Sequence, residues 1–206
     1  MDLSSSSLWV SAALVSLVAF LSGSLPFASW LGRLVAKKEV RAVGDGNPGA
    51  MNAFRAGGAS LGLSVLLLDV SKGVLPVVLA TEVFGFDGWL LTLVAVLPVA
   101  GAAFSPFLGL RGGKALAVTL GTWIGLTIWT IPLVAIVAIV AATLLIEPDG
   151  WAVAAALAAM LLGVVLWAPD RWLVVALLLQ AGIILWKHRS ELARPPRARR
   201  LRTRAT

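Results

Sequence analysis

Hydrophobic and polar residues alternate along this chain in long blocks. The apolar blocks cover residues 8–32, 60–84, 88–108, 115–146, 151–168 and 171–186. Each is close to or above the length of about 20 residues that a transmembrane helix requires. Their hydrophobicity is continuous, whereas strands of a membrane barrel alternate apolar and polar positions over about 10 residues. The pattern therefore predicts membrane-spanning helices.

Two of these blocks need interpretation. The first follows the acidic sequence MDLSSSS, which lacks the basic region of a secretory signal peptide, so we interpret it as the first span. The fourth is the longest and carries Pro132 near its middle. Because proline kinks or ends a helix, residues 115–146 form either one long tilted helix or two short ones.

The positions of the basic residues help to choose between these alternatives. Lysine and arginine near span ends are retained in the cytoplasm. Most of the 17 basic residues lie in residues 33–55, in the turn at 111–114 and in the tail from Lys187. These regions share one side only if residues 115–146 break near Thr130. We therefore predict an all-α integral membrane protein, a compact bundle of about seven transmembrane helices, with the N-terminus outside and the C-terminus cytoplasmic.

The same pattern predicts the domain organisation. Residues 1–190 are expected to form a single transmembrane helical domain, and residues 191–206 a basic cytoplasmic tail. A basic tail directly after a span end favours contact with anionic lipid headgroups, or a disordered topology anchor, over nucleic acid. Membrane lipids are thus expected partners and nucleic acid is not, while the sequence leaves the oligomeric state open.

Composition agrees with a membrane protein and excludes several kinds of site. Hydrophobic residues make up 59% of the chain, charged residues 13%, and the mean hydropathy is +0.94, outside the range of soluble domains. The absence of cysteine excludes disulfides, iron–sulfur clusters and thiolate nucleophiles. The single histidine, His188, excludes a multi-histidine metal site. We expect neither a metal nor a cofactor.

Two residue pairs inside the predicted spans have helical spacing. Asp69 and Lys72 are three positions apart, which places them on one face, where they can neutralise each other. Ionisable groups in a membrane usually face the bundle interior, so this pair is either a structural ion pair or a support for a site. Gly121 and Gly125 form a small-xxx-small pair, which predicts close helix packing.

Three polar clusters are expected at the cytoplasmic ends of spans: the glycine-rich loop at 43–55, the turn GLRGGK at 109–114, and WKHRSE at 186–191. Glycines allow backbone amides to converge on an anion. Arginine and lysine supply the positive charge that holds phosphate, and His188 is the one proton carrier near neutral pH. The alternative is that the glycines only connect helices and the basic residues only set topology or contact lipid.

In order along the chain, GSLPF (23–27), VGDGNPGAMNAFRAGG (43–58), LLLDVSKGVLPV (66–77), FLGLRGGKA (107–115) and KHRSE (187–191) resemble the bacterial acyl-phosphate:glycerol-3-phosphate acyltransferases, the PlsY family. This resemblance implies seven helices in the bacterial plasma membrane, with the active site toward the cytoplasm. It also implies transfer of a fatty acyl group from acyl-phosphate to the 1-hydroxyl of glycerol 3-phosphate, giving lysophosphatidic acid for phospholipid biosynthesis without a metal.

The resemblance also implies roles for individual residues. His188, Lys114 and Arg55 would be catalytic: Arg55 and Lys114 would hold phosphate groups, and His188 would bind the acceptor phosphate or assist proton transfer. The residues expected to bind or shape the substrate site are Asp45, Gly46, Asn47, Gly49, Asn52, Arg111, Gly112, Gly113, Arg189 and Glu191.

The chain departs from the family pattern inside these motifs. Asp45 and Met51 stand where the family has hydroxyl residues, Ala102 replaces a histidine, and Glu191 replaces an asparagine. A carboxylate beside a phosphate is repulsive unless it is protonated or paired. Three hypotheses follow: the family acyltransferase, a diverged acyltransferase with another acceptor or donor, or a non-catalytic membrane partner or permease-like protein.

Overall fold

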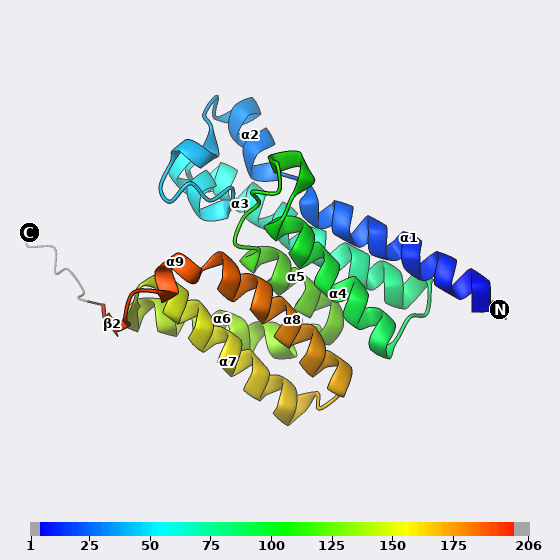
Figure 1. Cartoon of the computed structure of the whole chain (residues 1–206). Coiled ribbons are helices and arrows are strands. Elements are labelled where there is room, and N and C mark those ends of the chain that lie inside the picture. Colours follow the sequence, from blue (N-terminus) through cyan, green and yellow to red (C-terminus); the bar gives the residue numbers. More distant parts are fainter. Residues whose placement is uncertain (1–4, 200–206) are drawn as a thin grey trace, which may run out of the picture.

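A computed structural model describes residues 5–199 as a bundle of helices (Figure 1). The helices that build it are α1 (Ser5–Ser24), α3 (Ala50–Val78), α4 (Gly88–Ala103), α5 (Leu116–Thr127), α6 (Thr130–Leu145), α7 (Asp149–Trp167) and α8 (Arg171–Lys187). The shorter elements are α2 (Phe27–Val35), η1 (Val40–Ala42), η2 (Leu79–Val83), η3 (Pro106–Leu108), α9 (Arg189–Leu192), β1 (Ile146–Glu147) and β2 (Arg197–Ala198).

The predicted seven-helix membrane bundle is confirmed. Helical stretches at Ser7–Val35, Ala50–Val83, Gly88–Leu108 and Asp149–Trp167 are long and apolar enough to cross a membrane. The long apolar segment 115–146 divides into α5 and α6, as the charge pattern predicts, and the two have 12 and 16 residues. The turn between them exposes Ile128 and Trp129, which indicates that it lies within the apolar region rather than in water.

Close packing of helices α3 and α5 depends on small residues. A Cβ atom at Gly121 would overlap the Val70 carbonyl group, and one at Gly125 would press against the Val77 side chain. Small residues at helix contacts are the usual means of association in lipid, where burial of apolar surface gives little driving force. The packing role predicted for Gly121 and Gly125 is therefore confirmed.

A polar contact deep in the bundle fixes helices α4, α5 and α8 against one another. The Trp123 Nε1 atom donates to Gln180 Oε1 at 2.8 Å, and Gln180 Nε2 donates to the Ala95 carbonyl oxygen at 2.9 Å and to Thr122 Oγ1 at 3.2 Å. Trp123 and Gln180 are fully buried. Each polar group of the Gln180 side chain thus has a partner, as buried groups require.

Helix α3 is broken near its start. Gly57 and Gly58 leave the helical conformation, and Gly58 has a φ of 75°, which glycine adopts without steric cost. The predicted span 60–84 begins directly after this break. The short helical piece before it, from Ala50, carries Asn52 and Arg55 and belongs to the polar end of the bundle, where the sequence had indicated only a loop.

The ion pair inside the membrane forms as its spacing predicts. Lys72 Nζ lies 2.6 Å from Asp69 Oδ1, and both side chains are buried. The same ammonium group donates to the Leu25 carbonyl oxygen at 2.8 Å, in the link between α1 and α2. It also lies over the ring of Phe27. The pair therefore joins α3 to the junction of α1 and α2.

The described part of the C-terminal tail packs against the turn between α6 and α7. Strand β2 pairs antiparallel with β1, Arg199 pairs with Asp149, and Trp151 Nε1 donates to the Arg194 carbonyl oxygen at 2.8 Å. Up to residue 199 the tail therefore contacts protein, where the sequence had predicted lipid contact or a disordered anchor. Residues 200–206 lie outside the described part of the chain.

Candidate active site

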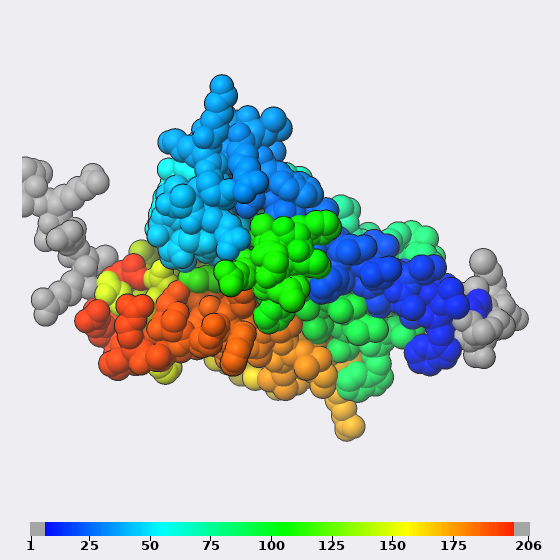
Figure 2. All heavy atoms as spheres, turned by 45° about the horizontal axis from the view of Figure 1, so that its top comes forward, coloured from blue at the N-terminus to red at the C-terminus, as the bar shows by residue number. Residues whose placement is uncertain are grey.

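The three polar clusters predicted from the sequence lie together at one end of the bundle. Figure 2 shows the segment before α3 in blue, the turn before α5 in green and the C-terminal helices in red on one continuous face. Their meeting point is Lys114, which precedes α5. Its Nζ atom lies 2.9 Å from Asp45 Oδ2 and 2.5 Å from Glu191 Oε1. One ammonium group therefore joins the two other clusters.

The glycine-rich loop is held in shape by its own side chains. Asp45 Oδ1 accepts from the Asn47 backbone amide at 3.2 Å and from Asn52 Nδ2 at 2.8 Å. Asn52 Nδ2 also donates to the Asn47 carbonyl oxygen at 3.0 Å. Gly44 and Gly46 have φ values of 62° and 74°, so the tight turns here favour glycine.

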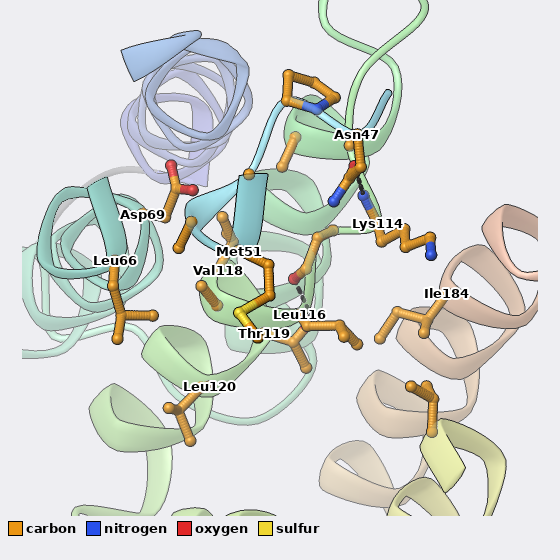
Figure 3. Close-up of a pocket in the computed structure, with 18 of the residues that line it drawn as sticks. Asn47, Met51, Leu66, Asp69, Lys114, Leu116, Val118, Thr119, Leu120 and Ile184 are labelled. Atoms are coloured by element: carbon orange, nitrogen blue, oxygen red, sulfur yellow. Dashed lines mark hydrogen bonds between the residues drawn. The ribbon is translucent and has the colours of Figure 1, made fainter. Parts of the chain in front are cut away.

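The same loop is anchored to the turn before α5. Asn47 Oδ1 accepts from the Lys114 backbone amide at 3.1 Å, and Figure 3 shows these two residues side by side. Gly113 lies against Asn47 and would crowd its amide if it carried a Cβ atom. Asn47 and Gly113 thus hold the glycine-rich loop against the turn before α5.

Arg55 supplies a second positive charge near the site. Its Nη1 atom donates to Asn52 Oδ1 at 3.0 Å, and its side chain is exposed. Within residues 5–199, Arg55 makes no ion pair, in contrast to Lys114. It therefore remains available to an anion that enters at the polar end of the bundle.

His188 caps helix α8 and is buried, with 1% of its surface exposed. Its Nδ1 atom lies 2.8 Å from the Ile184 carbonyl oxygen. A carbonyl oxygen only accepts hydrogen bonds, so Nδ1 carries the hydrogen and Nε2 of the neutral ring is an acceptor. Burial lowers the pKa of His188, and this effect outweighs the backbone hydrogen bond that raises it. The ring is therefore neutral near pH 7.

Asp45 and Lys114 stabilise each other's charged form. Burial by itself would raise the pKa of Asp45, but the hydrogen bonds from Lys114, Asn47 and Asn52 lower it to about 2. Burial likewise opposes the charged form of Lys114, yet Glu191 and Asp45 raise its pKa above the ordinary value. The Asp45 carboxylate and the Lys114 ammonium group are thus both charged at neutral pH.

A cavity of about 530 Å³ begins at this cluster and continues into the apolar part of the bundle. Asp45, Asn47, Arg55, Lys114 and His188 line its polar end, and Figure 3 shows Met51, Leu116 and Leu120 within the same cavity. The apolar lining from α3, α5, α6 and α7 includes Leu66, Leu116, Leu120, Ile136, Ile139, Leu157 and Met160. One cavity therefore offers a charged end and a hydrophobic end.

Several predicted site residues lie elsewhere. The Arg189 side chain donates to the Trp186 carbonyl oxygen at 2.9 Å and stacks over the Trp186 ring, away from Lys114. Arg111 is exposed and does not line the cavity. Gly112 and Gly46 do not line it either. These residues belong to the surrounding turns and helix ends.

Other residues that build the site had not been identified as part of it. Lys187 Nζ donates to the Ala103 and Gly112 carbonyl oxygens at 2.8 and 3.0 Å, so it ties the end of α8 to the turn before α5. The sequence analysis placed it in the WKHRSE cluster but gave it no role of its own. Asp69 and Lys72 also line the cavity, and their spacing had indicated a possible support role.

Comparison with known proteins identifies a family and individual proteins to which this chain is similar. The family described as glycerol-3-phosphate acyltransferase matches residues 13–196. The glycerol-3-phosphate acyltransferase of Anaeromyxobacter dehalogenans is 43% identical over 121 residues, 57% of this chain and 60% of that protein. That of Aquifex aeolicus is 34% identical over 152 residues, 66% of this chain and 79% of that protein. The chain thus spans about 60% of the length of its Anaeromyxobacter relative.

The fold is similar to crystal structures of PlsY, an integral membrane glycerol 3-phosphate acyltransferase. In its glycerol 3-phosphate form the TM-score is 0.78 at 29% identity, over 89% of this chain and 91% of that chain. In its lysophosphatidic acid form the TM-score is 0.81 at 28% identity, with the same coverage. Because the family match extends over residues 13–196, almost the whole bundle, this chain belongs to the glycerol-3-phosphate acyltransferase family.

Proposed function

We propose that this protein transfers a fatty acyl group from acyl-phosphate to the 1-hydroxyl of glycerol 3-phosphate, giving lysophosphatidic acid. The observation that carries the proposal is the single cavity with a charged end at Lys114 and Arg55 and an apolar end between α5, α6 and α7. Both substrates carry phosphate, and one also carries a long apolar chain. Solved relatives in glycerol 3-phosphate and lysophosphatidic acid forms support the same substrate class.

The reaction requires little covalent chemistry from the protein. The acceptor hydroxyl attacks the acyl carbonyl carbon, the bond from that carbon to the phosphate oxygen breaks, and phosphate leaves with its electron pair. Acyl-phosphate is already activated, so positioning of the hydroxyl and stabilisation of developing negative charge supply most of the rate. In this proposal Lys114 and Arg55 hold the phosphate groups.

His188 accounts for the proton that the acceptor hydroxyl loses. Its Nδ1–H is occupied by the Ile184 carbonyl oxygen, so the Nε2 lone pair is free to accept. Burial keeps the ring neutral by lowering the pKa of His188, and a neutral imidazole is a competent general base. The proposed role is thus hydrogen-bond acceptor or proton acceptor for the glycerol hydroxyl.

Orientation in the membrane follows from the charged end of the cavity. Glycerol 3-phosphate is a water-soluble anion, and the basic clusters around the cavity are those that topology keeps in the cytoplasm. We place the protein in the bacterial plasma membrane as a multi-pass enzyme, with the N-terminus outside and the C-terminus cytoplasmic. Membrane lipids surround the exposed apolar residues of the bundle.

One observation favours a second candidate, a diverged acyltransferase with a different acceptor. Lys114 has two carboxylate partners, Asp45 and Glu191, both at positions where the family resemblance expects uncharged residues. An acceptor with a hydroxyl or amine in place of phosphate would hydrogen-bond to these carboxylates without repulsion.

The test is formation of lysophosphatidic acid by the full chain, purified in detergent, with radiolabelled glycerol 3-phosphate and palmitoyl-phosphate. We expect product from the native chain and none from Lys114→Ala. If the folded native chain gives no product, the glycerol 3-phosphate reaction is wrong. Acyl transfer to glycerol or an amino alcohol in the same assay would then identify the second candidate.

A further inference from the structure

The Asp45 carboxylate is bound as an external anion would be. Three donors point at it: Lys114 Nζ at 2.9 Å from Oδ2, and Asn52 Nδ2 and the Asn47 amide at 2.8 and 3.2 Å from Oδ1. An ammonium group, a side-chain amide and a backbone amide of a glycine-rich loop are the groups that commonly hold phosphate. The Asp45 carboxylate therefore occupies donors that could otherwise hold a phosphate.

We propose that Asp45 is an internal competitor of the substrate phosphate, which binds to these donors only after the Asp45 carboxylate has turned away. The inference rests on the proposed function for the identity of the ligand, a phosphate monoester. It assigns Asp45 a role in setting affinity, where the sequence analysis had counted this residue among those that bind substrate.

The two carboxylates on Lys114 differ in how easily they can leave. The Asp45 side chain is 47% exposed and lies on a loop, so its carboxylate can pass into water. The Glu191 side chain is 18% exposed and packs against Gly150. Because moving Glu191 would require rearrangement of α9 against α7, Asp45 is the carboxylate that a phosphate displaces.

The loop keeps its shape when Asp45 leaves. Asn47 Oδ1 still accepts from the Lys114 amide, Asn52 Nδ2 still donates to the Asn47 carbonyl oxygen, and Arg55 still donates to Asn52. Turning one side chain thus frees three donors without unfolding the segment. Arg55, which donates to Asn52, lies beside them and makes no ion pair within residues 5–199.

This arrangement has a measurable consequence for affinity. A ligand that binds only to the form with Asp45 turned away has its apparent affinity reduced by the fraction of molecules in that form. Removing the Asp45 charge breaks the ion pair with Lys114, which raises the fraction of competent molecules, and it also removes like-charge repulsion in the complex. We therefore expect phosphate to bind about tenfold more tightly when position 45 is neutral.

The experiment titrates inorganic phosphate into the purified full chain in detergent by isothermal calorimetry. Asp45→Asn keeps the acceptor oxygen for Asn47 and Asn52 and removes only the negative charge that pairs with Lys114. The matched control is Asp87→Asn, which removes one negative charge from an exposed residue before α4 whose side chain makes no capping hydrogen bond. We expect about tenfold tighter phosphate binding for Asp45→Asn and no change for Asp87→Asn.

Two further variants keep the test decisive. Asp45→Ser places a small hydroxyl in the loop and should give the same gain if Asp45→Asn folds poorly. Lys114→Ala should abolish the gain when it is combined with Asp45→Asn, because non-additivity reports direct coupling. Unchanged or weaker phosphate binding in both folded Asp45 variants, or a gain that survives without Lys114, would overturn the inference.

Failure of this inference is distinguishable from failure of the proposed function, because phosphate binding needs no acyl transfer. Tighter phosphate binding in Asp45→Asn, with no lysophosphatidic acid from any variant, would leave Asp45 as the competitor and reject the proposed reaction. Lysophosphatidic acid from the native chain, with no tightening in the Asp45 variants, would do the opposite.

Discussion

Lys114 and Glu191 lie 77 positions apart in the sequence, yet their side chains meet with Nζ and Oε1 separated by 2.5 Å. The contact joins the start of α5 to α9, beyond the last membrane helix. Because α9 follows His188 directly, the same contact fixes the histidine relative to the lysine. The polar end of the cavity is thus assembled from both halves of the chain.

Replacement of Lys114 by alanine should reduce acyl transfer by at least about 100-fold, because the main positive charge for the departing phosphate is lost. Initial rates at saturating glycerol 3-phosphate measure this effect. Lys38→Ala is the control, since Lys38 is an exposed lysine in the segment before the glycine-rich loop. Native-like activity of a correctly inserted Lys114→Ala protein would remove Lys114 from the mechanism.

Arg55 and Arg189 should differ in importance, although both are basic residues of the predicted site. Arg55 lines the cavity, whereas the Arg189 side chain is engaged with Trp186. Arg55→Ala should therefore raise the KM for glycerol 3-phosphate about tenfold more than Arg189→Ala does, by loss of a charge-assisted phosphate contact. Equal effects, or a larger effect at Arg189, would contradict the geometry.

Activity should depend on pH through His188. Burial lowers the pKa of this ring below its ordinary value of 6.5, so kcat/KM should be flat above that pH and fall in more acid solution, as Nε2 takes a proton. Asp45, with a pKa of about 2, stays charged over the same range. The pH profile of the native chain, compared with that of His188→Gln, measures the contribution of this ring.

The lowered pKa of His188 also makes the stability of the fold depend on pH. The unfolded chain has a histidine with the ordinary pKa of 6.5, and the folded chain has one with a lower pKa. Below pH 6.5 the unfolded state therefore binds more protons, and stability falls as the pH decreases. Thermal unfolding of the native chain in detergent should show this acid loss, and unfolding of His188→Gln should show less of it.

Gln180→Leu should destabilise the bundle. It removes the partner of the Trp123 indole nitrogen and the donor to Ala95, which leaves buried polar groups unsatisfied. The expected loss is about 1–2 kcal/mol, the range found for interhelical hydrogen bonds in model transmembrane peptides and within the cost of an unsatisfied buried polar group. Unfolding in a denaturing detergent titration measures it, with Leu178→Ala on the exposed face of the same helix as the control. An unchanged midpoint for Gln180→Leu would show that this contact adds no stability.

Much of the fold could be predicted from the sequence, because membrane spans depend on one-dimensional properties. The break between α5 and α6 followed from the side on which the basic residues must lie, and packing at Gly121 followed from its spacing with Gly125. The short helical piece before Gly57 could not be predicted, because its charged and small residues read as a loop until the bundle supplies something for them to pack on.

The residues at the polar end of the cavity could be predicted in part. Residue types and motif order indicated Lys114, Arg55 and His188, but the direction of a side chain depends on tertiary contacts. Arg189 turns onto Trp186, although its charge suits a phosphate. Lys187 instead donates to the backbone carbonyl oxygens of Ala103 and Gly112 and so joins the end of α8 to the segment before α5. No local sequence pattern indicates these contacts. The partners of Asp45 were likewise visible only in three dimensions.

The cavity with one charged and one apolar end implies two different measures of substrate supply. In the proposed reaction, the acceptor is water-soluble and is counted by its molar concentration. A fatty-acyl donor is counted by its surface density, the mole fraction that it reaches in the bilayer. Adding inert lipid at constant total donor should slow the reaction by two-dimensional dilution, while half-saturation by the acceptor stays where it was. The mole fraction of the acyl donor in the bilayer therefore acts as the concentration of that substrate.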